Sequence, residues 1–456
     1  MRILLATYFM YPSTGGLNTY IAVLKKTLEA QGYTVDVLAR KPGPRLHLLS
    51  EEINMNTLRK MMSKPLNHYY KKHGQFSEPY IIKQELDRYV FELSSALLPI
   101  ETYDLIHAQD VVSTRALARV KPAHIPLVTT IHGLYSEERF NRGVIQTKND
   151  HSWKYSLAQE YIGALSADKV IVLTNWMRQR FQDQLNISSH HFETIPNGMF
   201  IEEFTNKLTN KTQVHIPESK KFTILCPARL VAEKDHRTLI DAVQLLKKER
   251  EDFICLLAGD GELREELEGY CREKEVQDVC LFLGNRNDIP ELMNRSDLVV
   301  LPSLQENLPF TVMEAQVAGK PLIVSNAGGL PEMVHDGVTG RLFKKRDSRQ
   351  LAFILKELMD HDEDRQLLGN NAKDWGRSQW SANTFCEKIK TVYAEALEQK
   401  KKEPRLMEFE SVNRPTYHTL ELHRFFEKSL WKKIDQCLPS NYTIPDPAFI
   451  KSLTTY

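Results

Sequence analysis

The chain has 456 residues, of which 42% are hydrophobic, and 60 Lys and Arg stand against 59 Asp and Glu. This length is enough for two α/β domains with their own cores, and the lack of a basic excess argues against a nucleic-acid partner. Six cysteines without a CxxC pair, several of them in apolar stretches, predict reduced thiols rather than disulfides or a zinc site.

The start of the chain, MRILLATYFMYP, has one basic residue and too short an apolar run for a signal peptide. No later segment reaches the roughly twenty apolar residues of a membrane span. Residues Arg2 to Thr7 are instead typical of a first β-strand. We therefore expect a cytoplasmic protein.

The first half of the chain places two candidate features at strand ends. Gly15 and Gly16 precede a helical pattern from Leu17 to Ala30, a turn whose backbone can approach a ligand closely. Tight packing alone also explains such a turn. His132 follows the predicted strand Leu127 to Ile131, at the edge where ligands collect in open α/β sheets, although a lone histidine there is usually structural.

A turn and two cations follow in the middle of the chain. The PNG sequence at 196–198 follows the strand-like Phe192 to Ile195 and has the composition of an interdomain turn. Arg229 and Lys234 come after a predicted strand, Phe222 to Cys226. Cations at such positions are usually on the surface.

Two more predicted strands end in glycine loops. Ile254 to Ala258 precedes the sequence GDG at 259–261, for which turn geometry is the first interpretation. Cys280 to Leu283 precedes Gly284 and Asn285.

The next stretch combines two carboxylates with a helix start. The apolar run Leu298 to Leu301 predicts a buried parallel strand that opens onto a loop with Glu306. A proline and a glycine then bracket a helix, Phe310 to Ala318, which carries Glu314 and has its positive end beside Glu306.

A second helix start follows the predicted strand Leu322 to Ser325, where Gly329 leads into a short helix, Leu330 to His335. Two helix N-termini at one end of a sheet offer backbone N–H groups to a diphosphate. The two glutamates can accept hydrogen bonds from sugar and ribose hydroxyls. The segment therefore predicts a sugar-nucleotide site.

Strands alternate with helical patterns along the chain, which predicts doubly wound parallel sheets in two Rossmann-like domains facing a cleft. We expect an N-terminal domain over 1–198 and a second domain over 199–378. A helix over 379–402 would cross back to the first domain, and 403–456 would be an amphipathic extension.

Other catalytic motifs are missing from the sequence. Asp360 and Asp362 have the Asp-x-Asp spacing of a cation site, but they lie in the charged run DHDEDR, which is typical of a solvated surface. There is no HExxH, GxSxG or P-loop sequence. We expect no metal and no other cofactor.

Glu306, seven residues, Glu314 and then GGLPE at 328–332 together resemble the donor site of the retaining family 4 glycosyltransferases. The resemblance implies the GT-B fold and transfer of a sugar from a nucleotide sugar without a metal ion. A pair of glutamates at this spacing is common by chance, so the surrounding strand, loop, helix and GGLPE carry the comparison.

The resemblance assigns four residues to catalysis. In the family the histidine that matches His132 lies against the donor sugar, with its carbonyl towards the anomeric carbon. Arg229 and Lys234 would stabilise the departing diphosphate, where fixed cations can replace a metal ion. Glu306 would hold the sugar hydroxyls.

The remaining matches bind the donor. Glu314 would hold the ribose hydroxyls, and the other matches act through their backbone. These are Gly15 and Gly16 beside the phosphate and acceptor, Gly284 and Asn285 at the base, and Gly329 and Leu330 at the diphosphate. The departing phosphate itself would take the acceptor proton.

Several positions depart from the family pattern. Phe200 replaces the aspartate that follows the PNG turn, and Asp235 replaces the glycine after Lys234. Asn307 and Leu308 replace a small and an aromatic residue. We expect the changes at 235, 307 and 308 to tune the choice of sugar.

Two segments are additions to a minimal family member. The first, His47 to His73, contains Tyr69 and Tyr70 and is rich in lysine (Lys60, Lys64, Lys71 and Lys72). It is either a solvated surface insertion or a peripheral contact with anionic lipid or acceptor. The second, beyond Glu403, has helical apolar spacing, which predicts packing on the N-terminal domain or, second, a partner or membrane contact. Its apolar residues are Leu422, Phe425, Phe426, Leu430, Ile434 and Leu438.

We therefore expect a retaining hexosyltransferase, with a UDP-sugar as donor and a glycan or lipid-linked acceptor, in glycan, cell-envelope or surface polysaccharide biosynthesis. A sugar-nucleotide epimerase of the same fold and an inactive scaffold that keeps the donor site are the alternatives.

Overall fold

The computed structural model describes residues 1–72, 78–210, 222–402 and 420–446. His73 of the predicted insertion, and 403–419 and 447–456 of the predicted extension, lie outside these ranges. Contacts divide the chain into two compact units. The first comprises Met1–Leu173, Arg178–Ile195 and Cys386–Tyr456, and the second comprises Thr174–Met177 and Pro196–Phe385.

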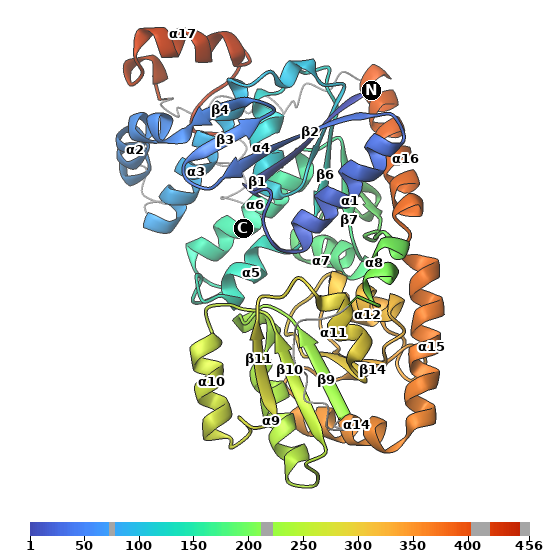
Figure 1. Ribbon diagram of the computed structural model, residues 1–456. Coiled ribbons are helices and arrows are strands. Elements are labelled where there is room, and N and C mark those ends of the chain that lie inside the picture. The colour runs from blue at the N-terminus through green and yellow to red at the C-terminus, as the bar shows by residue number, and fades with distance from the viewer. Residues whose placement is uncertain (73–77, 211–221, 403–419, 447–456) are drawn as a thin grey trace. The chain divides into compact units, whose positions relative to one another are not determined.

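The first unit is built on an eight-stranded sheet in the order β4-β3-β2-β1-β5-β6-β7-β8 (Figure 1). Its strands are β1 (Arg2–Met10), β2 (Thr34–Lys41), β3 (Arg45–Leu48), β4 (Glu51–Asn54), β5 (Leu105–Ala108), β6 (Leu127–Ile131), β7 (Lys169–Val172) and β8 (Phe192–Thr194). All pairs are parallel except β2 with β3 and β3 with β4. The predicted first strand and Leu127 to Ile131 are thus confirmed.

The helices of this unit connect its strands. They are α1 (Gly16–Ala30), α2 (Met55–Lys72), α3 (Pro79–Ala96), α4 (Val111–Val120), α5 (Tyr135–Asn141), α6 (His151–Leu165) and α7 (Asn175–Leu185), with short 3-10 turns η1 (Ile100–Thr102) and η2 (Ser189–His191). Residues 175–177 at the start of α7 belong to the second unit. Helix α4 packs against both α3 and α6. Asp110 caps α4 by accepting from Ser113 N–H at 2.7 Å, as is usual for an aspartate at a helix start.

The second unit contains a six-stranded, wholly parallel sheet in the order β11-β10-β9-β12-β13-β14. Its strands are β9 (Phe222–Pro227), β10 (Phe253–Ala258), β11 (Cys280–Gly284), β12 (Leu298–Leu301), β13 (Leu322–Ser325) and β14 (Arg341–Phe343). Its helices are α8 (Ile201–Lys207), η3 (Ala232–Lys234), α9 (His236–Lys247), α10 (Arg264–Glu273), α11 (Ile289–Arg295), α12 (Phe310–Val317), α13 (Leu330–Met333), α14 (Ser348–Asp360) and α15 (Asp362–Gln379). Runs such as Leu298 to Leu301 are buried on both faces, which explains their lack of apolar alternation.

Each sheet has one point at which the strand order reverses. In the first unit the chain passes from β1 to β2 on one side, and β5 pairs with the other side of β1. In the second unit β9 lies between β10 and β12 in the same way. In open α/β sheets the ligand binds at the carboxyl ends of the strands at this point. The fold therefore predicts ligand-binding loops after β1 and β5 in the first unit, and after β9 and β12 in the second unit.

Within the described residues, the predicted insertion comprises most of the β3–β4 hairpin and the helix α2. Strands β3 and β4 extend the sheet, and α2 packs against α3. Tyr69 and Tyr70 are buried in α2, so neither is available for a lipid surface. The four predicted lysines are exposed.

The C-terminal part of the chain returns to the first unit. Helix α16 (Ala382–Lys402) begins in the second unit and belongs to the first from Cys386 onward. After η4 (Leu422–Arg424), α17 (Lys428–Cys437) packs against α3 through a face that buries Ile434. This helix is shorter than the apolar spacing predicted, and Phe425 is exposed.

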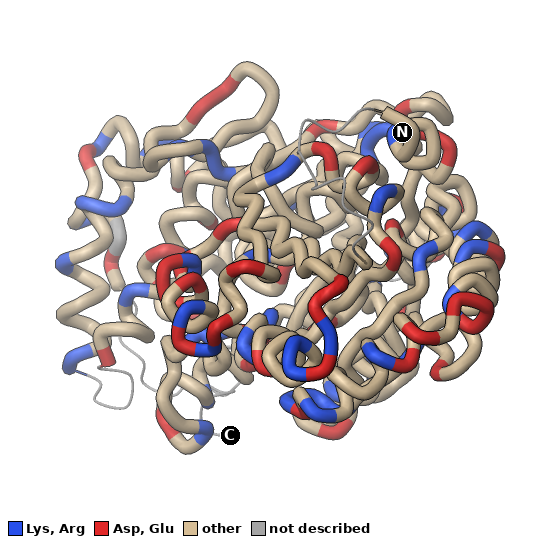
Figure 2. Tube along the Cα trace, turned by 60° about the horizontal axis from the view of Figure 1, so that its bottom comes forward, with Lys and Arg blue, Asp and Glu red and all other residues tan. Residues whose placement is uncertain are grey.

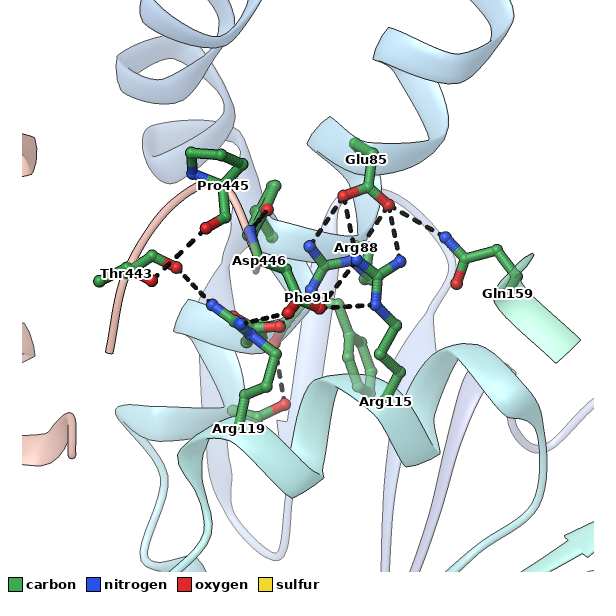
Figure 3. A network of polar contacts seen from close by, with 12 residues as sticks. Glu85, Arg88, Phe91, Arg115, Arg119, Gln159, Thr443, Pro445 and Asp446 are labelled. Atoms are coloured by element: carbon green, nitrogen blue, oxygen red, sulfur yellow. Dashed lines mark hydrogen bonds and ion pairs between the residues drawn. The ribbon is translucent and has the colours of Figure 1, made fainter. Parts of the chain in front are cut away.

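A buried ion-pair network anchors the last described residues (Figure 3). Asp446 pairs with Arg115 and Arg119, both from α4, at 2.9 Å each. Arg115 also pairs with Glu85 of α3 at 2.9 Å, and Arg119 donates to the carbonyl of Thr443. The end of the described chain is therefore part of the core of the first unit.

Candidate active site

The loops after β9 and β12, at the reversal point of the second sheet, carry the predicted cations and the first predicted carboxylate. Lys234 in η3 forms an ion pair with Glu306, and the side chains are 16% and 9% exposed. The Ser303 hydroxyl donates to the same Glu306 oxygen, Oε1, at 2.8 Å. The sequence did not predict that Lys234 and Glu306 contact one another, nor that Ser303 takes part.

Backbone contacts hold these two loops together. The Leu304 N–H donates to the Glu233 carbonyl at 2.8 Å, which ties the loop after β12 to η3. Arg229 lies in the same loop as Lys234, is 56% exposed and contacts Glu233 only at 3.4 Å. Its guanidinium is therefore able to turn towards an anionic ligand at little cost.

The glycine loops after β10 and β13 support this arrangement. A Cβ at Gly259 would lie 2.1 Å from the Ala228 carbonyl oxygen, and one at Gly261 would lie 2.4 Å from that of Leu230. A Cβ at Gly328, where φ is +58°, would lie 1.9 Å from the Glu306 carbonyl oxygen. Only glycine allows these loops to pass so closely. Turn geometry, the first interpretation of the GDG sequence, thus also fixes the loop of Arg229.

Gly329 and Leu330 differ from what the sequence predicted. The Gly329 N–H donates to the Glu306 carbonyl at 3.0 Å, and the Leu330 N–H donates to the Ala327 carbonyl at 3.1 Å. Both backbone donors expected at the diphosphate are therefore already paired. The predicted helix after them is only the single turn of α13.

Glu314 lies on α12, whose first turn contacts the end of β9 through a hydrogen bond of 3.2 Å from Thr311 Oγ1 to the Pro227 carbonyl. Residues three apart on a helix share a face, so Glu314 follows Thr311 on that side. Burial raises the pKa of Glu314 to about 7, and the cation of Lys207 opposes this shift. Within the described ranges, no hydrogen bond or ion pair reaches its carboxyl. A half-buried carboxyl in this state can accept hydroxyl donors from a ligand.

Gly284 ends β11 with φ of +67°, a conformation that favours glycine, and the exposed Asn285 follows it. Gly284 forms a bridge with Gly259, so it stands beside the loop of Arg229.

Asn307 and Leu308, which depart from the family pattern, form hydrogen bonds with Thr174 and Asn197. The Asn307 amide accepts from Thr174 at 2.6 Å, and the Leu308 carbonyl accepts from Asn197 at 3.1 Å.

The backbone conformation at position 235 explains why an aspartate can replace the family's glycine there. It has φ of +46° and ψ of +48°, in the left-handed region that glycine favours and aspartate tolerates. Its carboxylate accepts from Thr238 Oγ1 at 2.6 Å in the first turn of α9. The residue therefore shapes the turn after Lys234.

The first unit holds the other predicted residues. Gly15 has φ of +126° and ends the loop before α1, whose first N–H groups have no partner within the helix. His132 follows β6, and its Nε2 lies 3.1 Å from Gln109 Oε1. Burial lowers the pKa of His132 to about 3, so the ring is neutral at physiological pH. The sequence did not single out Gln109, although its position after the apolar run Leu105 to Ala108 was a signal.

Among the described residues, charged side chains of both signs are mixed and potential metal ligands do not cluster. In the view of Figure 2, Lys and Arg are interspersed with Asp and Glu over the described residues. Asp360 pairs with Arg250 at 2.6 Å, as expected of a surface charge run. Among the described residues, no three His, Cys, Asp or Glu side chains could jointly hold a metal ion. In the same ranges, no helix has the length and apolar character needed to cross a membrane.

Two family models match the chain in succession. The model for Glycosyltransferase Family 4 matches residues 14–203, and that for Glycosyl transferases group 1 matches residues 209–375. The two matches together cover most of the chain.

Curated relatives and solved structures agree with these matches. An uncharacterized glycosyltransferase of Methanocaldococcus jannaschii is 25% identical, over 87% of this chain and 99% of its own. The UDP-Gal:alpha-D-GlcNAc-diphosphoundecaprenol alpha-1,3-galactosyltransferase of Escherichia coli is 28% identical, over 65% of this chain and 76% of its own. The structure of Anabaena HepE in complex with UDP-glucose has a TM-score of 0.63 at 20% identity, covering 87% of this chain and 100% of that one. The predicted two-domain α/β fold is confirmed.

Proposed function

The chain belongs to the GT-B glycosyltransferases of group 1 and family 4, and from this we propose that it is a retaining, metal-independent hexosyltransferase. It would move a sugar from a nucleoside diphosphate sugar to an acceptor hydroxyl. The bond from the anomeric carbon to the phosphate oxygen breaks, the bond to the acceptor oxygen forms, and the acceptor proton passes to the departing phosphate.

One observation carries this proposal, the contact of Lys234 with Glu306 at the reversal point of the second sheet. Among the described residues, the side-chain hydrogen bonds to the Glu306 carboxylate both reach Oε1, which leaves Oε2 for a sugar hydroxyl. Lys234 and the exposed Arg229 place two cations in the adjoining loop. Negative charge that develops on a leaving diphosphate is stabilised by such fixed cations. Glu314 would hold the ribose.

The relatives support a narrower donor and acceptor. The E. coli relative uses UDP-Gal and a diphosphoundecaprenol-linked sugar by its name, and HepE binds UDP-glucose. We therefore propose a UDP-sugar donor and a glycan or lipid-linked acceptor, in glycan, cell-envelope or surface polysaccharide synthesis.

The first test is nucleotide release from a panel of UDP-, GDP- and ADP-sugars, each with and without a crude glycan or lipid extract. We expect acceptor-dependent release from one donor, and loss of that release in Glu306→Gln. Glu363→Gln on the exposed face of α15 is the matched control and should behave as the native protein. Release of nucleotide that needs no acceptor would favour an epimerase. No release, together with no thermal protection by any nucleotide, would favour an inactive scaffold.

Nucleotide binding should depend on pH through Glu314. The ribose hydroxyls would bind the ionised carboxylate, and the free carboxyl has a pKa of about 7. Affinity should therefore rise as the pH increases from 6 to 8, and Glu314→Gln should lower it about tenfold and flatten this dependence. Calorimetric titration of nucleoside diphosphate across this range measures both effects. If the affinity of the native protein does not change with pH, Glu314 does not bind the ribose hydroxyls.

A further inference from the structure

Gln109 occupies the reversal point of the first sheet, directly after β5. Its backbone N–H donates to the Ala6 carbonyl of β1 at 2.8 Å. The carboxylate of the next residue, Asp110, accepts from the N–H groups of Tyr8 at 2.8 Å and Ser113 at 2.7 Å. The backbone at Gln109 is therefore held by β1 on one side and by the start of α4 on the other.

The side-chain amide of Gln109 has one possible orientation. The side chain is 1% exposed, and its Nε2 donates to the His107 carbonyl at 3.3 Å. A carbonyl accepts and cannot donate, so the NH₂ group must face His107. The amide oxygen consequently faces His132 Nε2 at 3.1 Å.

This orientation determines where the proton lies on His132. An amide oxygen only accepts hydrogen bonds, so Nε2 of His132 must carry the proton. The neutral ring has one N–H, and Nδ1 therefore keeps the lone pair. His132 contributes an acceptor at Nδ1 and no positive charge.

His107, whose carbonyl orients the Gln109 amide, is itself held by hydrogen bonds at both ring nitrogens. His107 contacts the Tyr393 hydroxyl of α16 through Nδ1 at 2.7 Å and Thr130 Oγ1 through Nε2 at 2.8 Å. Tyr20 of α1 contacts the same Thr130 oxygen at 3.0 Å, and its ring stands edge-on to His132 with centroids 4.5 Å apart. Buried polar networks of this kind restrict the side chains to one arrangement.

We propose that Gln109 is a positioning residue, which fixes the Nε2–H tautomer and the ring orientation of His132. The proposal rests on the proposed function and on the catalytic role that the family resemblance implies for His132. An imidazole held in this state carries its lone pair on Nδ1 and no positive charge. The same logic applies to histidines in metal sites and catalytic triads, where the partner of one nitrogen determines the role of the other.

The direct test is the ¹⁵N spectrum of histidine-labelled protein, in which the two neutral tautomers have distinct nitrogen shifts. The His132 signal is assigned by its loss in His132→Gln. We expect the Nε2–H tautomer in the native protein and a mixture of tautomers in Gln109→Leu. Gln109→Glu keeps an acceptor oxygen and should keep the proton on Nε2, either in the neutral Nε2–H tautomer or in the imidazolium. Gln179→Leu, an exposed glutamine of α7, is the matched control and should leave the signal unchanged.

Kinetics supply the second readout. We expect Gln109→Leu to lower kcat by about 10- to 100-fold with a smaller change in KM, as for other groups that orient a functional histidine. Gln109→Glu should restore part of kcat and extend the activity loss at low pH to higher pH, because a carboxylate favours the imidazolium.

The outcomes separate this proposal from the proposed function. An Nδ1–H tautomer in the native protein, or an unchanged His132 signal in folded Gln109→Leu, would overturn the positioning role whatever the activity. If Gln109→Leu does not fold, the protonation of His132 Nε2 in the native protein and in Gln109→Glu decides whether the proposal holds. The expected tautomers without turnover of any donor would support the positioning role and contradict the proposed function.

Discussion

Lys234→Ala is expected to lower the rate of sugar transfer by on the order of 10²- to 10³-fold, the usual effect of removing a group that stabilises charge in the transition state. Lys234 lies beside Glu306 at the carboxyl edge of β9 and β12. The substitution removes a cation from the leaving diphosphate and leaves the Glu306 carboxylate without its counter-ion. Both effects act on kcat. The measurement is kcat and KM with the donor identified by the release assay.

Two variants make this result specific. Lys234→Arg keeps the charge but not the compact ammonium, and should retain part of the activity. Lys356→Ala removes a cation from the exposed surface of α14, where it pairs with Glu249, and should leave kcat unchanged. If Lys234→Ala has the same kcat as the native protein, Lys234 does not stabilise the transition state. Equal losses in Lys234→Ala and Lys356→Ala would indicate a general effect of charge.

The second large effect is expected for stability. Asp446→Ala should destabilise the first unit by about 3–5 kcal/mol, the usual cost of removing one partner from a buried ion pair. Three arginines of this network, Arg88, Arg115 and Arg119, pair with the carboxylates of Glu85, Glu92 and Asp446. Loss of Asp446 leaves an uncompensated buried positive charge.

Hydrogen exchange of peptides from α3 and α4, at increasing urea, measures this loss in the first unit alone. That choice matters because two units need not unfold as one transition. Glu398→Ala removes an exposed carboxylate from α16 of the same unit and should change little. Equal protection in Asp446→Ala and the native protein would show that the tail does not belong to the folded core.

The same network predicts sensitivity to acid. Although burial alone would raise it, the guanidinium groups of Arg119 and Arg115 lower the pKa of Asp446, and those of Arg115 and Arg88 lower the pKa of Glu85 to about 2. A carboxyl with a lowered folded-state pKa stabilises the fold above its unfolded pKa, near 4, and loses this contribution as the pH falls. The native protein should therefore lose stability below about pH 4, and Asp446→Ala should show less of this loss.

Local patterns in the sequence were sufficient for most elements near the candidate site. The strands Leu127 to Ile131, Leu298 to Leu301 and Leu322 to Ser325 have the bounds that were predicted. Short β-branched runs that end in proline, glycine or polar residues carry this information locally. The helix predicted to reach His335 ends at Met333 because the backbone of Val334 is extended, with φ of −126° and ψ of +117°. The His335 N–H then donates to Thr339 Oγ1 instead of continuing the helix.

The insertion and the tail show where such patterns are insufficient. A basic amphipathic helix is compatible with solvent, with lipid or with another helix. Only the contact of α2 with α3 shows that Tyr69 and Tyr70 are buried. Likewise no property of Asp446 in the sequence indicates that it meets Arg115, 331 positions away.

The sequence by itself determined the family and the types of residue available for chemistry, because motifs such as Glu306, Glu314 and GGLPE are short and contiguous. The tertiary structure alone decided which of these groups touch. Lys234 meets Glu306 across 72 positions, and His132 meets Gln109 across 23 positions, because β9 lies beside β12 and β5 lies beside β6. Strand order brings the carboxyl ends of these strands together, and strand order is a property of long-range packing that no local pattern encodes.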